Sequence, residues 1–216
     1  MGRQHPSLSL PGVFLVPEKE QKMKKLCMSA ALAAIAVLVF GNFAMQANNS
    51  NDGDALRFST RLSTFNEVPP KANGAHGTFR AKLSEDGTTL SWTFTWSGLT
   101  GPPMVAHIHF GLEGNIYPVM TFFCGGPKGN ADIPQKPDCP QTTSGSISGT
   151  TTAVDIIPLN TAGPTDQALD LHDFAGFIRA LGAGSAYANM HTTRFPVGEI
   201  RGQIAAHRSD RDEDDE

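Results

Sequence analysis

The sequence predicts an all-β fold, an antiparallel Greek-key sandwich or barrel of about eight strands with one short helix. Apolar and polar residues alternate with period two in successive short segments, as in strands that bury one face. Turn-forming residues separate these segments, and the 216 residues include 22 glycines and 15 prolines. A sandwich or barrel joins many short strands in this way. The chain has no G-X-Y period and no heptad repeat, and its 39% hydrophobic content is enough for a core, which excludes collagen, coiled coils and wholesale disorder.

The charge of the chain limits the classes of partner. The formal net charge is −4, and the expected folded part contains no block rich in lysine and arginine. A nucleic-acid partner is therefore not expected.

The N-terminal part predicts an export signal. Residues 23–47 combine Lys24 and Lys25 with an apolar stretch and then a small residue, Ala47, which is the pattern of a cleavable signal peptide. Because Met23 looks like the true start, we expect residues 1–22 to be an upstream extension of the reading frame.

An uncleaved membrane anchor is the open alternative for this segment. Residues 26–47 carry no charge and are long enough to span a bilayer. In either case the following residues are expected to leave the cytoplasm, so we predict a secreted or periplasmic protein that contacts a membrane only if the signal stays uncleaved.

The remaining chain divides into a short linker at residues 48–54, a domain at residues 55–205 and an acidic tail at residues 206–216. The tail ends in RSDRDEDDE, with six negative charges and two positive ones. Such a run cannot bury apolar surface, and we expect it to be disordered.

The strands of the domain are expected where the alternation is clearest. The third of them, for example, places Leu90, Trp92, Phe94 and Trp96 on one face. The glycine-ended sequence SEDG joins the second and third strands as a hairpin loop. The expected strands cover residues 56–62, 79–83, 90–96, 104–110, 118–124, 146–156, 185–192 and 198–205.

One segment has helical rather than strand spacing. Residues 166–181 place leucine, phenylalanine and isoleucine side chains near a helical repeat, and Gly182 follows as a stop signal. We expect one helix or two short turns here, over an open end of the sandwich.

Export also determines the chemistry of the cysteines. Removal of Cys27 with the signal leaves Cys124 and Cys139, an even pair in an oxidising compartment. We predict a disulfide between them. A thiolate metal site is the alternative, but a lone spaced pair lacks the C-x-x-C pattern of such sites.

Histidines on two strands form the candidate site. His107 and His109 lie two residues apart, so they share one face of a strand while their apolar neighbours face the core. His191 has the same orientation on a second strand. Three imidazoles from neighbouring strands suit copper or zinc.

Three further residues on the same face could surround these histidines, namely Asn189, Glu199 and Arg201. The alternative is a polar network without metal, in which Glu199 and Arg201 form an ion pair worth under about 1 kcal/mol. Glu67, in the sequence NEVPP, is expected to anchor a turn, although it could reach a ligand. No motif for a nucleophile or a phosphate-binding loop is present, and no catalytic residue is assigned.

Four motifs in order, NEVPP, AHIHFG, YANMHT and GEIRGQI, resemble the CHRD domain over residues 56–204. That domain is named after the extracellular protein chordin and also occurs in many secreted bacterial proteins. The resemblance implies an immunoglobulin-like β-barrel distantly similar to copper/zinc superoxide dismutases. HIHFG is similar to the H-x-H copper motif of those enzymes, but no histidine is present over residues 111–160 to build their zinc site.

We therefore expect a non-catalytic extracellular binding module for an unidentified protein or surface ligand. Its cofactor, if it has one, would be copper or zinc. The alternative is a copper-dependent oxidoreductase of the superoxide dismutase-like type, with copper on His107, His109 and His191.

Overall fold

Nine strands form one continuous sheet in the computed structural model, which describes residues 55–160 and 163–208. The elements are β1 (Leu56–Ser63), η1 (Thr64–Asn66), β2 (His76–Leu83), β3 (Leu90–Ser97), β4 (Pro103–Phe110), β5 (Val119–Cys124), β6 (Gly145–Thr151), η2 (Ala153–Asp155), α1 (Phe174–Gly182), β7 (Ala186–Thr192), β8 (Ile200–Gln203) and β9 (Ala205–Arg208).

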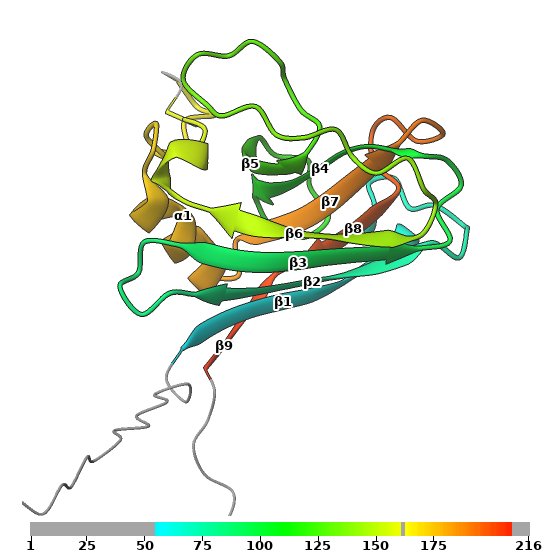
Figure 1. Ribbon diagram of the computed structural model, residues 1–216, viewed down its shortest axis with the longest axis horizontal. Coiled ribbons are helices and arrows are strands. Elements are labelled where there is room, and N and C mark those ends of the chain that lie inside the picture. Colours follow the sequence, from blue (N-terminus) through cyan, green and yellow to red (C-terminus); the bar gives the residue numbers. More distant parts are fainter. Residues whose placement is uncertain (1–54, 161–162, 209–216) are drawn as a thin grey trace, which may run out of the picture. The chain divides into compact units, whose positions relative to one another are not determined.

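The sheet curls into a nearly closed barrel (Figure 1). Its strand order is β5-β4-β7-β8-β1-β2-β3-β6, with β9 paired to β1, and every recorded pairing is antiparallel. The two ends of this order, β5 and β6, border the open seam. The predicted all-β fold class is therefore confirmed.

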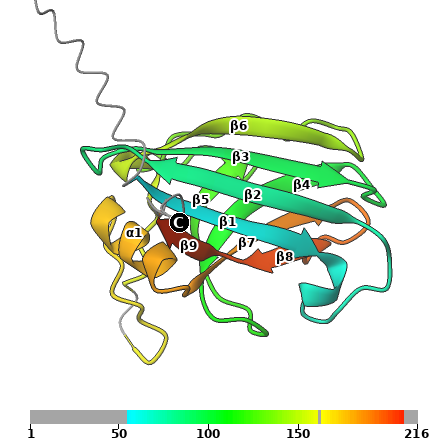
Figure 2. The ribbon, with the colours of Figure 1, turned by 90° about the horizontal axis from the view of Figure 1, so that it is seen from below.

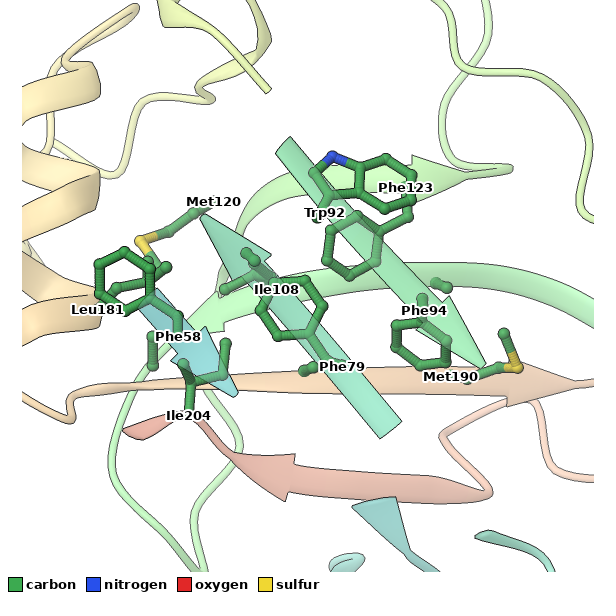
Figure 3. Packing of buried hydrophobic residues seen from close by; sticks show 14 of the residues in the cluster. Phe58, Phe79, Trp92, Phe94, Ile108, Met120, Phe123, Leu181, Met190 and Ile204 are labelled. Atoms are coloured by element: carbon green, nitrogen blue, oxygen red, sulfur yellow. The ribbon is translucent and has the colours of Figure 1, made fainter. Parts of the chain in front are cut away.

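The interior is filled by the apolar residues of the alternating segments (Figure 3). Phe123 of β5 packs against residues from the opposite wall, with its ring centroid 5.2 Å from that of Phe79 and 4.5 Å from that of Trp92. Because these contacts cross the barrel, the core joins β5 to β2 and β3 although the sheet does not close there.

Helix α1 lies at one end of the barrel (Figures 1 and 2). Asp173 begins it by accepting a hydrogen bond from the backbone N–H of Gly176. Phe177 and Leu181 are fully buried, and Leu181 reaches the core beside Phe58 (Figure 3). The helix is shorter than the predicted segment, because residues 166–170 are irregular and a turn at residues 171–172 precedes it.

Three strand predictions differ from the structure. The expected strand at residues 79–83 begins earlier, at His76 of β2. The expected strand at residues 146–156 ends at Thr151, because the Asp155 carboxylate accepts a hydrogen bond of 2.8 Å from the Thr152 N–H and folds the chain into η2. The expected strand at residues 198–205 is instead the short β8, followed by β9.

Strand β9 extends the sheet beyond the predicted end of the domain. Ala205–Arg208 pairs with residues 56–59 of β1, so ordered structure continues three residues beyond the predicted boundary at residue 205. The rest of the predicted tail, residues 209–216, lies outside the described residues. So do the predicted extension (1–22), signal peptide (23–47) and linker (48–54).

The predicted disulfide joins Cys124 at the end of β5 to Cys139 in the loop before β6. Both cysteines are buried in the core. Within the described ranges, no helix has the length and apolarity needed to cross a bilayer.

Candidate metal site

The site lies on β4 and β7, which are neighbours in the sheet. Along β4, Ala106 and Ile108 face the core and leave His107 and His109 on the other side. The register places Asn189 of β7 opposite His107, and His191 opposite Val105. The alternation seen in the sequence thus brings all three predicted histidines to one face.

The three imidazoles form a compact cluster. One ring nitrogen from each of His107, His109 and His191 lies within 4.8 Å of the other two. The ring centroid of His107 is 4.4 Å from that of His109 and 4.7 Å from that of His191, with steep angles of 84° and 70° between the planes. The rings therefore meet edge to face and do not stack.

The cluster is buried, although it lies on the face opposite the core. His107 is 3% exposed and His109 8%, while His191 is partly exposed. Two loops, residues 111–118 and 193–199, supply the backbone groups that contact this face. Loop 111–118 thus contributes to the site itself.

These loops fix the tautomers of two histidines. Nδ1 of His109 lies 2.5 Å from the carbonyl oxygen of Tyr117, and Nδ1 of His191 lies 2.8 Å from that of Pro196. A carbonyl oxygen only accepts hydrogen bonds, so each Nδ1 carries the proton and donates. The lone pair of each ring is consequently on Nε2. Metal-binding histidines are commonly oriented by hydrogen bonds of this kind.

Several buried polar atoms of this face have no hydrogen-bond partner among the described residues. They include Nδ1 of His107, Nε2 of His191 and Oδ1 of Asn189. A buried polar atom without a partner costs about 1–3 kcal/mol. Because the three residues lie together on β4 and β7, these atoms mark a position where a ligand would satisfy them.

Burial keeps the imidazoles neutral. Desolvation is the largest cause that lowers the pKa of each of the three, with further lowering from neighbouring imidazoles at His107 and His109. The pKa of His107 lies well below its usual value, and that of His109 falls to about 4. A neutral imidazole is the form that binds metals.

A stack of side chains supports the cluster on one side. The ring of Tyr187 lies 4.4 Å from that of His109, at 13° between planes, and the Arg201 guanidinium carbon lies 3.4 Å from the centroid of Tyr187. Arg201 also donates hydrogen bonds to the carbonyl oxygens of Leu112 and Asn115. Arg201 therefore joins loop 111–118 to the face that holds the histidines.

The predicted surrounding residues have different roles. Asn189 donates a hydrogen bond to the carboxylate of Glu67, which is 4% exposed and whose pKa is raised mainly by desolvation. Glu67 also accepts from the backbone N–H of Val68, as a turn anchor does. Glu67 thus lies next to the site and supports it through Asn189.

Glu199 forms its hydrogen bonds with residues other than the histidines. Among the described residues, its recorded hydrogen-bond partners are Thr100, Thr192 and Asn73, and no imidazole or Arg201 is among them.

Sequence patterns identify the histidines but not their partners in the loops. Tyr187 shares the face of His191 and could be placed there by alternation. The carbonyl groups of Tyr117 and Pro196 carry no residue-specific signal, because every residue has one. His76 and His172 are exposed and outside the cluster.

The residues present fit a transition-metal ion. Three ligand nitrogens at about 2.0–2.1 Å from one metal are about 3.3–3.6 Å apart in tetrahedral or trigonal geometry. The ring nitrogens lie within 4.8 Å of one another, so metal binding would require them to approach by up to about 1.5 Å. Three neutral imidazoles suit zinc and copper.

Comparison with known proteins agrees with the motifs. No curated protein and no solved structure gives a significant match. The family model for the CHRD domain matches residues 58–204, from the inward-facing Phe58 of β1 to the residue after β8. The match covers more than half of the chain and contains all three histidines, and the chain belongs to the CHRD domain family.

Proposed function

We propose that this CHRD domain is an exported, non-catalytic binding module that holds one copper or zinc ion on His107, His109 and His191. The observation that carries the proposal is the convergence of the three imidazoles, with one ring nitrogen of each within 4.8 Å of the others. The ligand atoms would be Nε2 of His109 and of His191, whose Nδ1 atoms donate to backbone carbonyls, and the unpartnered Nδ1 of His107.

Export is supported by the disulfide and by the family. A structural disulfide persists in oxidising compartments and is rare in the cytosol. The predicted signal peptide at residues 23–47 would direct the chain to the secreted or periplasmic space.

The burial of the site supports a binding role over catalysis. A catalytic metal keeps an open coordination position that a substrate can reach. Here His107 and His109 are nearly fully buried, and only His191 is partly exposed. Arg201 is also unsuited to guide an anionic substrate, because it is 3% exposed and its guanidinium donates to backbone carbonyls.

Metal titration tests the proposal. The purified protein is titrated with Cu²⁺ and with Zn²⁺ by calorimetry, and elemental analysis gives the metal content after dialysis. We expect one ion per chain, and loss of stoichiometric binding in His107→Ala/His109→Ala. The ligands must be neutral, so affinity should fall with decreasing pH.

A matched variant controls for histidines elsewhere. His76→Ala/His207→Ala removes two exposed imidazoles and should keep the one-to-one stoichiometry. Because the double substitution in β4 alters a buried strand, circular dichroism checks its folding and the single variant His191→Gln provides a second test. Binding that persists in the folded variants, or no binding by the unaltered protein, would exclude the metal site.

A further inference from the structure

The sheet register places Asn189 between the three histidines. Pairing of β4 with β7 sets it directly opposite His107, with His109 two residues along β4 and His191 two residues along β7, on opposite sides of this pair. Asn189 shares the face of the histidines and is 3% exposed. Residues directly opposite each other in antiparallel strands have Cβ atoms about 4.5–5.5 Å apart. The side chain of Asn189 therefore begins beside that of His107.

The amide group of Asn189 has a fixed orientation. Its Nδ2 donates hydrogen bonds to the carboxylate of Glu67 and, at 3.4 Å, to the backbone carbonyl of Ile200. Because a backbone carbonyl only accepts hydrogen bonds, the nitrogen and the oxygen of this amide cannot be exchanged. The oxygen, Oδ1, therefore occupies the arm of the amide that is not bonded to Glu67 or Ile200.

Glu67 is itself held in place on the far side of Asn189. It is 4% exposed and accepts a hydrogen bond of 3.3 Å from the backbone N–H of Val68. A Cβ atom on Gly198 would lie 2.6 Å from Oε1 of Glu67, so loop 193–199 packs directly against the carboxylate. The acceptor that orients the amide of Asn189 is thus fixed by two other segments of the chain.

Oδ1 of Asn189 lacks a hydrogen-bond donor. It is buried and has no partner among the described residues, and the same holds for Nε2 of His191 and Nδ1 of His107. Nε2 of His191 carries a lone pair, because Nδ1 of that ring donates to the carbonyl of Pro196. Two lone pairs cannot satisfy each other by hydrogen bonding. Acceptors that are grouped in this way on one buried face suit a cation.

We propose that Oδ1 of Asn189 is the fourth ligand of the metal ion, which completes a site of three nitrogens and one oxygen. The inference rests on the proposed function. Nδ1 of a histidine and Oδ1 of an asparagine both lie one bond beyond Cγ, so the directly opposite His107 and Asn189 can present these atoms to one ion. Glutamine and backbone oxygens are ligands in some copper sites, and zinc is usually four-coordinate. A fourth protein ligand closes the site, as expected for binding without catalysis.

A matched pair of double variants tests the fourth ligand. Glu67→Gln/Asn189→Asp exchanges the carboxylate and the amide, so a hydrogen bond between the two side chains and an oxygen at position 189 are both kept. Glu67→Gln/Asn189→Leu differs only at residue 189 and has no oxygen there. Competition with a chromophoric chelator measures the affinity of each purified protein for Zn²⁺ and for Cu²⁺. We expect the first variant to bind at least as tightly as the unaltered protein, and the second to bind at least about tenfold more weakly.

The crystal structure of the metal-loaded protein gives a readout that a purely supporting role would not change. A ligand oxygen lies about 2.0–2.2 Å from zinc, and we expect Oδ1 of Asn189 at that distance. A metal-bound water in its place would overturn the proposal. Equal affinity of the two folded double variants would overturn it as well. If circular dichroism shows that the leucine variant does not fold, the metal-loaded structure alone decides.

These outcomes are distinct from those that test the histidine site. If His107→Ala/His109→Ala abolishes binding while the two double variants bind equally, the proposed function stands and the fourth ligand is rejected. If the unaltered protein binds neither ion, both are rejected.

Discussion

The three buried histidines make stability depend on pH. The unfolded chain binds protons near pH 6.5, whereas folded His109 binds its proton only near pH 4. Between these pH values the folded state therefore carries fewer protons than the unfolded state. The contribution of His109 to the free energy of unfolding is complete above about pH 6.5 and is lost as the pH falls. His107 and His191 act in the same direction, since their pKa values are also lowered by burial.

We expect the metal-free protein to lose stability between pH 6.5 and pH 5. For His109 alone the loss approaches about 1.4 kcal/mol per pH unit. Glu67 acts in the opposite direction, because its raised pKa favours the folded state at lower pH. Urea unfolding at several pH values, compared between the unaltered protein and His109→Gln, isolates the histidine contribution. The variant should have the shallower pH dependence.

Two outcomes of that comparison would contradict the prediction. One is equal pH dependence in the protein and in His109→Gln, and the other is a free energy of unfolding that rises as the pH falls. The exposed His76→Gln is the matched substitution and should behave as the unaltered protein does.

At the same scale, the sequence predicts which histidines share one face but not that this face is buried. Alternation places His107, His109 and His191 on one face because a strand has only two faces. It also suggests an open face, since the core lies on the other side. Only the folded loops show that the carbonyls of Tyr117 and Pro196 close over this face.

At the scale of elements, strands with strong alternation are predicted well and short irregular ones are not. Segments such as β3, with Trp92, Phe94 and Trp96 facing inward, have clear borders. Strand β9 has the sequence AAHR, which contains no apolar alternation, and it forms only because the adjacent edge of β1 offers backbone partners. Pairing of this kind depends on tertiary neighbours and cannot be seen in a local pattern.

The disulfide stabilises the loop beside the open seam. It links residues 15 apart, and the loop it closes has few apolar residues to hold it in place. Reduction should lower the free energy of unfolding by about 3 kcal/mol, the chain-entropy value for a loop of this length. Urea unfolding with and without a phosphine reductant measures the difference. Equal midpoints would show that the bridge adds no stability.

At the scale of the whole molecule, the two outer sides of the barrel differ in exposure. The side formed by β4, β7 and β8 buries its polar residues beneath loops, as the 3% exposure of both His107 and Arg201 shows. The side formed by β1, β2, β3 and β6 exposes polar side chains, such as those of Arg80, Thr93 and Ser148. The barrel thus separates an enclosed candidate metal site from an open polar face.

One buried carboxylate ties together the end of the barrel opposite α1. Glu199 is fully buried and accepts hydrogen bonds from Thr100 (N–H and Oγ1, both 2.9 Å), from Thr192 Oγ1 at 2.7 Å and from Asn73 at 3.4 Å. These three partners come from segments far apart in the chain. The Glu199 side chain therefore holds together parts of the barrel end that are not neighbours in sequence.

We expect Glu199→Gln to destabilise the protein by about 3 kcal/mol. The amide nitrogen replaces an acceptor with a donor, so at least one buried donor of Thr100 or Thr192 loses its partner, and bonds to a charged group become bonds to a neutral one. Thermal and urea unfolding measure the effect, with the exposed Glu85→Gln as the matched control. A loss below about 0.5 kcal/mol, the range of ordinary surface substitutions, would contradict this role. Since Glu199 has no recorded hydrogen bond to an imidazole, the folded variant should still bind metal one to one.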